Sequence, residues 1–127
     1  MANRDELLGR ALGLYGQDKF AEAIGAYRAV LDADPRCTDA LHGLAMAYFQ
    51  LQRYDEAIET AKKIVEIDPE DSFAHTSLSM FYQRKGMIAE AERESAEARL
   101  AGWKKELREQ GGEAGPTPGF PGPGSNP

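Results

Sequence analysis

The amino-acid sequence predicts an all-α protein made of three copies of a two-helix unit. Two segments nearly copy each other, KFAEAIGAYRAVLDADP at residues 19–35 and RYDEAIETAKKIVEIDP at residues 53–69, at an offset of 34 residues. Within each copy, apolar residues recur at steps of three and four, which is the spacing of an amphipathic helix. Small residues keep one register in the first and second helices of the copies: Ala11, Ala45 and Ser79, then Ala23, Ala57 and Ala91.

The central copy, residues 38–71, sets the boundaries of the other two. Its two helices are separated by a short break around Gln52 and Arg53, so they must lie antiparallel against each other. The second helix ends at Asp68, because the residue before Pro69 is disfavoured in helical geometry. Shifting this frame by 34 residues in each direction predicts three units, at about residues 4–37, 38–71 and 72–101.

Residues 102–109 are predicted to cap the third unit. Leu100, Trp103 and Leu107 form an apolar stripe among charged residues, which suits either a short terminal helix or a continuation of the preceding one. The repeat domain would then span residues 1–109. Residues 110–127 are rich in Gly and Pro and show no periodic apolar face, so they are predicted to be a flexible tail.

Composition narrows the classes of partner. The formal net charge is −6, and phosphate contacts need clustered Lys and Arg, so we expect no nucleic-acid partner. No apolar run approaches the length of a membrane span, and charges occupy the start of the chain where a signal peptide is apolar. The single cysteine, Cys37, cannot form an internal disulfide. A cytoplasmic protein without membrane insertion is therefore expected.

The sequence offers no set of residues for catalysis or metal binding. His42 and His75 lie in neighbouring first helices, but no pattern of Cys, Asp or Glu completes a coordination set around them. No serine–histidine–acid set, phosphate-binding loop or nucleophile elbow is present either. We therefore expect a non-catalytic protein that uses neither a metal ion nor a cofactor.

The 34-residue helix-turn-helix period, with small residues in register, resembles the tetratricopeptide repeat. The resemblance covers residues 4 to about 101. The aromatic that opens the second helix and the closing proline of that family also match, at Phe20, Tyr54, Pro35 and Pro69. This resemblance implies a right-handed superhelical stack of three repeats, whose first helices line a concave groove that receives a peptide or helix of another protein.

The first unit departs from the repeat at one position. Arg10 stands where the later units carry Leu44 and Leu78, as expected at the unpaired N-terminal end of a stack. The third unit also departs, with Ile88 in place of the opening aromatic.

Carried over from the family by position, the groove would be lined mainly by apolar and aromatic side chains. These predicted groove residues are Leu8, Leu12, Tyr15, His42, Met46, Phe49, Phe73, Met80 and Arg84.

Family members that hold the acidic C-terminal tails of heat-shock chaperones use a clamp of Lys, Asn and Arg. The clamp positions are occupied here by Leu8, Leu12, Gly43, Phe73 and Ser77. None of these side chains can hold a carboxylate, so the resemblance implies a groove for apolar anchors and argues against a co-chaperone of that kind.

Two interpretations of the function remain open. The chain is either an adaptor that docks a peptide or helix of another protein in the groove, or a structural subunit of a larger or self-associated complex that packs by its outer faces and tail. A third interpretation concerns the groove residues alone, which would also suit the core of a tighter superhelix.

Overall fold

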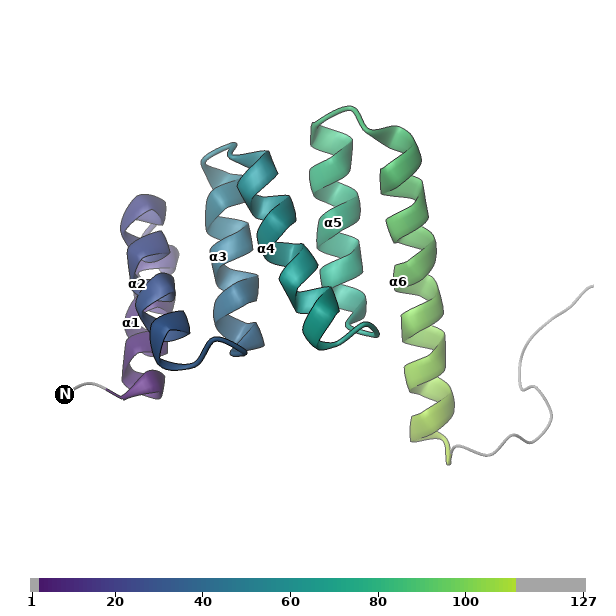
Figure 1. The fold of residues 1–127 in the computed structure, drawn as a ribbon, viewed down its shortest axis with the longest axis horizontal. Coiled ribbons are helices and arrows are strands. Elements are labelled where there is room, and N and C mark those ends of the chain that lie inside the picture. Colours follow the sequence, from purple (N-terminus) through teal and green to yellow (C-terminus); the bar gives the residue numbers. More distant parts are fainter. Residues whose placement is uncertain (1–2, 112–127) are drawn as a thin grey trace, which may run out of the picture.

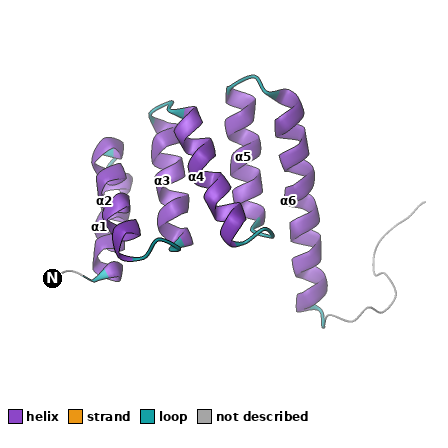
Figure 2. Cartoon of the chain, in the orientation of Figure 1, coloured by secondary structure: helices purple, strands orange, loops and turns teal. Residues whose placement is uncertain are grey.

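The structure is a computed structural model that describes residues 3–111. Within these residues it contains six α-helices and no β-strand, so the predicted all-α class is confirmed. Figure 2 colours the helices and the loops between them. The helices are α1 (Arg4–Gly16), α2 (Phe20–Ala33), α3 (Thr38–Gln50), α4 (Tyr54–Ile67), α5 (Ser72–Arg84) and α6 (Ile88–Glu109). Residues 112–127 of the predicted tail lie outside the described part of the chain.

The helices form three antiparallel pairs that follow one another along the long axis of the molecule (Figure 1). Contacts are densest within the pairs α1–α2, α3–α4 and α5–α6, and next between α2 and α3 and between α4 and α5. The second helices α2 and α4 therefore each pack on two first helices, their own and the next. The structure thus has the predicted stack of three helix-turn-helix units.

The turn inside each unit repeats the same backbone geometry. The amides of Lys19, Arg53 and Met87 each donate to a carbonyl five residues earlier, at 2.9 Å. The preceding residue adopts a positive φ in every unit, at Asp18 (62°), Gln52 (61°) and Gly86 (80°). This bond and a left-handed residue together end a helix in the way of a Schellman motif. The turn therefore sets the antiparallel return of the second helix.

Small side chains lie where the two helices of a unit cross. Ala11, Ala23, Ala45, Ala57 and Ala91 are all buried. Where the third unit has a serine instead, the Ser79 hydroxyl donates to the carbonyl of Ala91 at 2.8 Å, so its polar group is satisfied inside the helix pair. The predicted register of small residues is thus the contact line of each pair.

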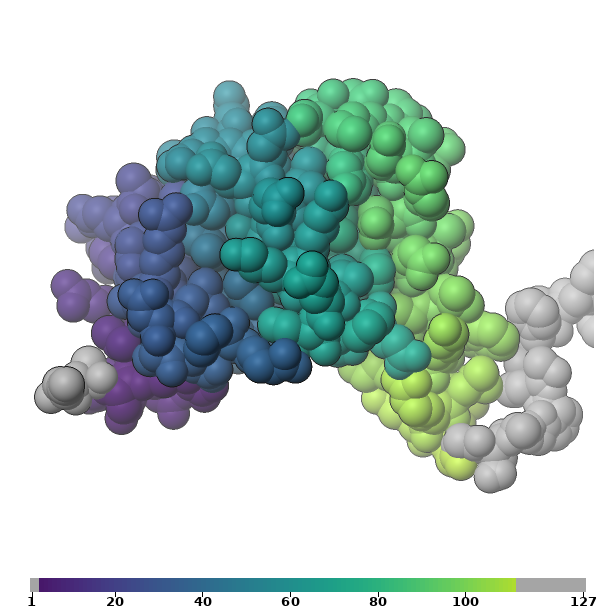
Figure 3. All heavy atoms as spheres, viewed as in Figure 1, coloured from purple at the N-terminus to yellow at the C-terminus, as the bar shows by residue number. Residues whose placement is uncertain are grey.

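Residues 102–109 were predicted to form either a separate short helix or a continuation of the preceding helix. They continue α6 as its last turns, with Gly102 inside the helix, and do not form a separate helix. Arg108 pairs with Glu70 of the α4–α5 loop at 2.6 Å, which ties this end of α6 to the stack. Figure 3 shows the C-terminal part of α6 projecting beyond the other helices.

Gly43 on α3 allows a close contact between the first two units. A β-carbon at Gly43 would lie 2.2 Å from Cζ of the buried Tyr27 ring on α2. Glycine costs about 1 kcal/mol relative to alanine inside a helix. The close fit of the Tyr27 ring against the α3 backbone offsets this cost. Gly9 occupies the same position of the first unit, and a β-carbon there would meet no atom within 4 Å.

These two glycines give a matched test of the stacking contact. Gly43→Ala should lower the free energy of unfolding by about 1–3 kcal/mol, because the methyl group forces Tyr27 out of its place. Gly9→Ala should raise it by roughly 0.5–1 kcal/mol, because it adds helix propensity in open space. Urea unfolding of the two variants measures both values. Equal effects of the two changes would contradict the role of Tyr27.

His75 is a buried histidine that joins α5 to α6 and to the α4–α5 loop. Its Nε2 donates to the Pro69 carbonyl at 2.8 Å, and its Nδ1 lies 2.7 Å from Oε1 of Glu94 on α6. Burial favours the neutral ring, but the hydrogen bonds to Glu94 and Pro69, with the negative charges of Glu94 and Glu97, outweigh it. The pKa of His75 is therefore raised above 6.5.

This raised pKa makes part of the stability depend on pH. The contribution of the charged ring is complete below pH 6.5 and is lost as the pH rises through the folded-state pKa. The free energy of unfolding of the wild type and of His75→Gln is measured between about pH 5.5 and pH 8.5. The difference between the two isolates the contribution of His75, because both proteins share the other titrating groups. The wild-type advantage should shrink with rising pH, and Glu94→Gln should remove most of this slope. An advantage that grows with pH would be incompatible with a raised pKa.

Candidate functional site

A cavity of about 340 Å³ opens on the side of the stack formed by α1 and α3. We call it the α1–α3 cup. Six of the nine predicted groove residues line it: Leu8, Leu12, Tyr15, His42, Met46 and Phe73. Tyr27, Asp39 and Gly43 complete its lining. The 3.6-residue period places the α1 and α3 residues on one face of each helix, and successive units bring those faces together.

Two of the large apolar side chains that are exposed in the described part of the chain stand at this cup. Phe73 is 63% exposed and Leu12 is 54% exposed, although both are large and apolar. Leu8, Tyr15 and Met46 are half-buried around them. An apolar patch of this kind on a folded chain commonly marks a binding surface.

The Phe73 side of the cup is held by a polar contact beneath it. His42 meets the Phe73 ring edge-on, with 5.1 Å between the ring centroids. Its Nε2 lies 3.0 Å from Oδ2 of Asp71, and Oδ1 of Asp71 accepts the amide of Ala74 as the cap of α5. His42 therefore links α3 to the start of α5 beside Phe73.

Tyr27 closes the cup from below, and the sequence pattern did not identify it. It lies on the second helix of its unit, so the period assigns it to the core. Gly43 leaves room for its ring to reach the cup between α1 and α3. Burial raises the pKa of the Tyr27 phenol, and Tyr15 adds to the shift, so the group stays neutral. In the sequence, only Gly43, a glycine in the middle of a helix, indicated that a side chain could pass so close to α3.

The charge of the cup is negative. Asp39, exposed in the first turn of α3, contributes the one carboxylate of the lining, and no Lys or Arg lines the cup within residues 3–111. No ion pair of Asp39 with another described residue is formed. A carboxylate ligand would meet this charge without a cation to offset it.

Phe49 and Arg84, also predicted for the groove, lie elsewhere. The half-buried Phe49 ring packs on Tyr54 and on the fully buried Phe81, with centroid distances of 5.7 Å and 5.2 Å. Arg84 covers the same ring at 4.9 Å from its centroid. Phe49 therefore belongs largely to the contact between the second and third units.

Met80, the last of the nine, lies in a separate shallow cavity. That cavity runs between α5 and α6 and has a volume of about 360 Å³. Its lining is largely polar or small, with Thr76, Ser79 and Gln83 from α5 and Ser95 from α6. The predicted groove is therefore divided, and its apolar part is the α1–α3 cup.

The described residues hold few groups for chemistry. Within residues 3–111, no three His, Cys, Asp or Glu side chains come together as a metal site would require. In the same part of the chain, no helix combines the length and apolar character needed to cross a membrane. Cys37 is buried between the first two units as a free thiol.

Comparison with solved structures shows the same architecture in proteins of low sequence identity. The second tetratricopeptide domain of Spaghetti (RPAP3), solved with the HSP90 peptide SRMEEVD, has a TM-score of 0.74 at 23% identity and covers 78% of this chain and 92% of its own. The translocator chaperone SycD of Yersinia enterocolitica has a TM-score of 0.76 at 22% identity, covering 84% of this chain and 82% of its own.

MamA, with a TM-score of 0.79 at 24% identity, covers 82% of this chain, which spans 61% of MamA. A search of curated protein sequences gives no match.

The family model of the tetratricopeptide repeat matches residues 8–72, just over half of the 127 residues. This match agrees with the 34-residue register of the turns and of the buried small residues. The chain belongs to the tetratricopeptide repeat family.

Proposed function

We propose that the protein is a non-catalytic protein–protein interaction module that binds an apolar anchor of a partner peptide or helix in the α1–α3 cup. The observation that carries this proposal is the exposure of Leu12 and Phe73 at a concave, apolar surface. When a partner covers exposed apolar surface in a concave site, removal of that surface from water contributes favourably to the free energy of binding.

The relatives support peptide binding in general. Spaghetti (RPAP3) is described with a bound HSP90 peptide, and SycD is described as a chaperone of secretion translocators.

The chemistry of this cup favours an apolar anchor over a carboxylate. Leu8, Leu12, Gly43 and Phe73 occupy clamp positions and line the cup, while Ser77, the fifth position, is buried. None of these offers a cation, and Asp39 adds a negative charge at the edge. A carboxylate would lose its hydration here and gain no charged partner.

The dimensions of the cup suit a small part of a partner. Its volume of about 340 Å³ is at the low end of ligand pockets, which span roughly 300–1,000 Å³. We propose that one or two large side chains of an extended segment or of one helix turn fill it, and that flanking contacts are weaker. A few buried anchors dominate many interfaces of this kind.

The competing interpretation, a structural subunit that packs by its outer faces, does not exclude this use of the cup. The cup is made by one face of α1, with Leu8, Leu12 and Tyr15, whereas Leu7, Arg10 and Leu14 lie on another face of that helix.

The cup is tested by selecting peptides from a random display library on the full-length protein. The selected peptides should carry a large apolar anchor, and Phe73→Ala should weaken the best of them about 10- to 30-fold, near 2 kcal/mol. The peptide SRMEEVD serves as the acidic comparison and should bind no more tightly than its scrambled form.

Stability measurements separate binding from folding in the same variants. Phe73→Ala should change the free energy of unfolding by less than about 1 kcal/mol, because the ring is mostly exposed. Leu44→Ala, at a position only 6% exposed, should cost about 2–5 kcal/mol. If SRMEEVD binds tightly, or if no peptide depends on Phe73, the proposed use of the cup is wrong.

A further inference from the structure

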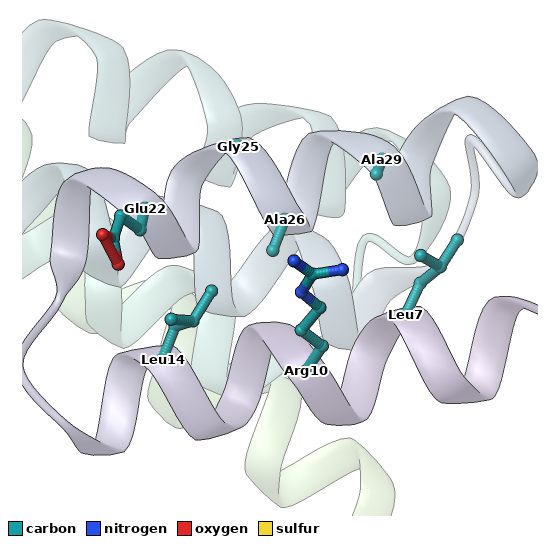
Figure 4. Close-up of a pocket in the computed structure, with 7 residues that line it drawn as sticks. All are labelled: Leu7, Arg10, Leu14, Glu22, Gly25, Ala26 and Ala29. Atoms are coloured by element: carbon teal, nitrogen blue, oxygen red, sulfur yellow. The ribbon is translucent and has the colours of Figure 1, made fainter. Parts of the chain in front are cut away.

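The first unit leaves a second surface open, on the opposite flank of α1. We call it the N-terminal face. It is a valley of about 520 Å³ between α1 and α2, shown in Figure 4. Its lining combines two leucines, one cation, one anion and three small residues: Leu7, Leu14, Arg10, Glu22, Gly25, Ala26 and Ala29.

The repeat itself shows that these α1 positions are normally covered. The residues 34 positions after Leu7, Arg10 and Leu14 are Leu41, Leu44 and Tyr48, and all three are buried. In α5 the same positions hold His75, Leu78 and Tyr82, which are buried as well.

The cover in the later units comes from the preceding second helix, since α2 packs on α3 and α4 packs on α5. One such contact is the hydrogen bond from the Arg28 guanidinium on α2 to the Tyr48 hydroxyl on α3. In the first unit Leu7 and Leu14 are only half-buried and Arg10 is exposed. No helix within residues 3–111 covers them.

The two charges of the N-terminal face have no partner within the described residues. Arg10 and Glu22 form no ion pair there, with each other or with other side chains. In Figure 4 the Arg10 side chain reaches from α1 across the valley toward Ala26, whereas Glu22 stands at the end near Leu14. The cation and the anion therefore occupy different places along one valley.

We propose that the N-terminal face binds the same face of a second copy of this chain, in a dimer with two-fold symmetry. In such an interface, residue i of one copy meets residue j of the other, and residue j meets residue i. Arg10 of each copy then pairs with Glu22 of the other, on either side of a contact between leucines. The small residues of α2 let the two helix pairs approach closely.

A head-to-tail stack would place the N-terminal face of one copy against α6 of the next copy. The side chains of α6 favour the two-fold arrangement instead. At three positions where the second helices pack on the next unit, α2 carries Ile24, Tyr27 and Leu31, and α4 carries Ile58, Ala61 and Val65. At these positions α6 has Glu92, Ser95 and Arg99. These three positions are polar, as a terminal unit in contact with water requires. Ile88, Leu100 and Trp103 are exposed elsewhere on α6, but the three positions that a further unit would cover offer the leucines of the N-terminal face no apolar contact.

The inference goes beyond the proposed function, because the two surfaces use different side chains. A dimer through Leu7, Arg10 and Leu14 leaves the α1–α3 cup of each copy accessible.

Charge reversal tests the symmetry of the contact directly. Sedimentation equilibrium of the full-length wild type should show a monomer–dimer equilibrium. Arg10→Glu makes the face wholly acidic and Glu22→Arg makes it wholly basic, so each variant alone should dimerise at least about tenfold more weakly. An equimolar mixture of the two should form a heterodimer, because each acidic face then meets a basic one. The double variant Arg10→Glu/Glu22→Arg should dimerise like the wild type.

Two controls separate the contact from folding and from net charge. Lys63→Glu changes the charge as Arg10→Glu does, at an exposed place on α4, and should dimerise like the wild type. Circular dichroism and binding of a cup-selected peptide should be unchanged in all these variants. A wild type that stays monomeric up to about 1 mM, single variants that dimerise like the wild type, or a mixture that stays monomeric would each overturn the proposal.

Discussion

The close approach of two helices within each unit is the constraint on which the rest of the structure depends. Ala11 and Ala23 make this approach in the first unit, and Ala45 and Ala57 make it in the second. Larger side chains here would push the helices apart and shift every later contact, because α2 and α4 also pack on the next unit. The serine of the third unit fits the same rule, since the Ser79 hydroxyl bonds to the α6 backbone inside the crossing.

The second level of packing, between units, shapes the surface as well as the core. Tyr27 is buried between the first two units, yet its ring also closes the bottom of the α1–α3 cup, because Gly43 lets it pass close to the α3 backbone. The cup is therefore a by-product of how two units stack. Its lining is buried at the base, where Tyr27 lies, and most exposed at the rim, where Leu12 and Phe73 stand.

The period of the sequence predicted which face each residue takes but not how deeply it lies. It identified all six helices, and the resemblance to the tetratricopeptide repeat placed Leu12, Met46 and Phe73 on one side of the stack. It could not show that Phe49 is largely covered, because that depends on Phe81 of the next unit and on the stacking of Arg84. The form of residues 102–109 also stayed open, because Gly102 is compatible with either a break or a continuous helix.

In a repeat protein, equivalent positions of different units can be compared with one another. A position that changes in one unit shows where that unit lacks a neighbour that the other units have. Leu44 and Leu78 are buried by the preceding second helix, and Arg10 stands at the same place in the first unit. Burying a guanidinium against an apolar helix without a counter-charge would cost several kcal/mol. A further apolar repeat on the N-terminal face is therefore disfavoured, and the face suits either water or a surface that brings an anion. A second copy of the chain brings that anion in Glu22, together with two leucines that water does not stabilise.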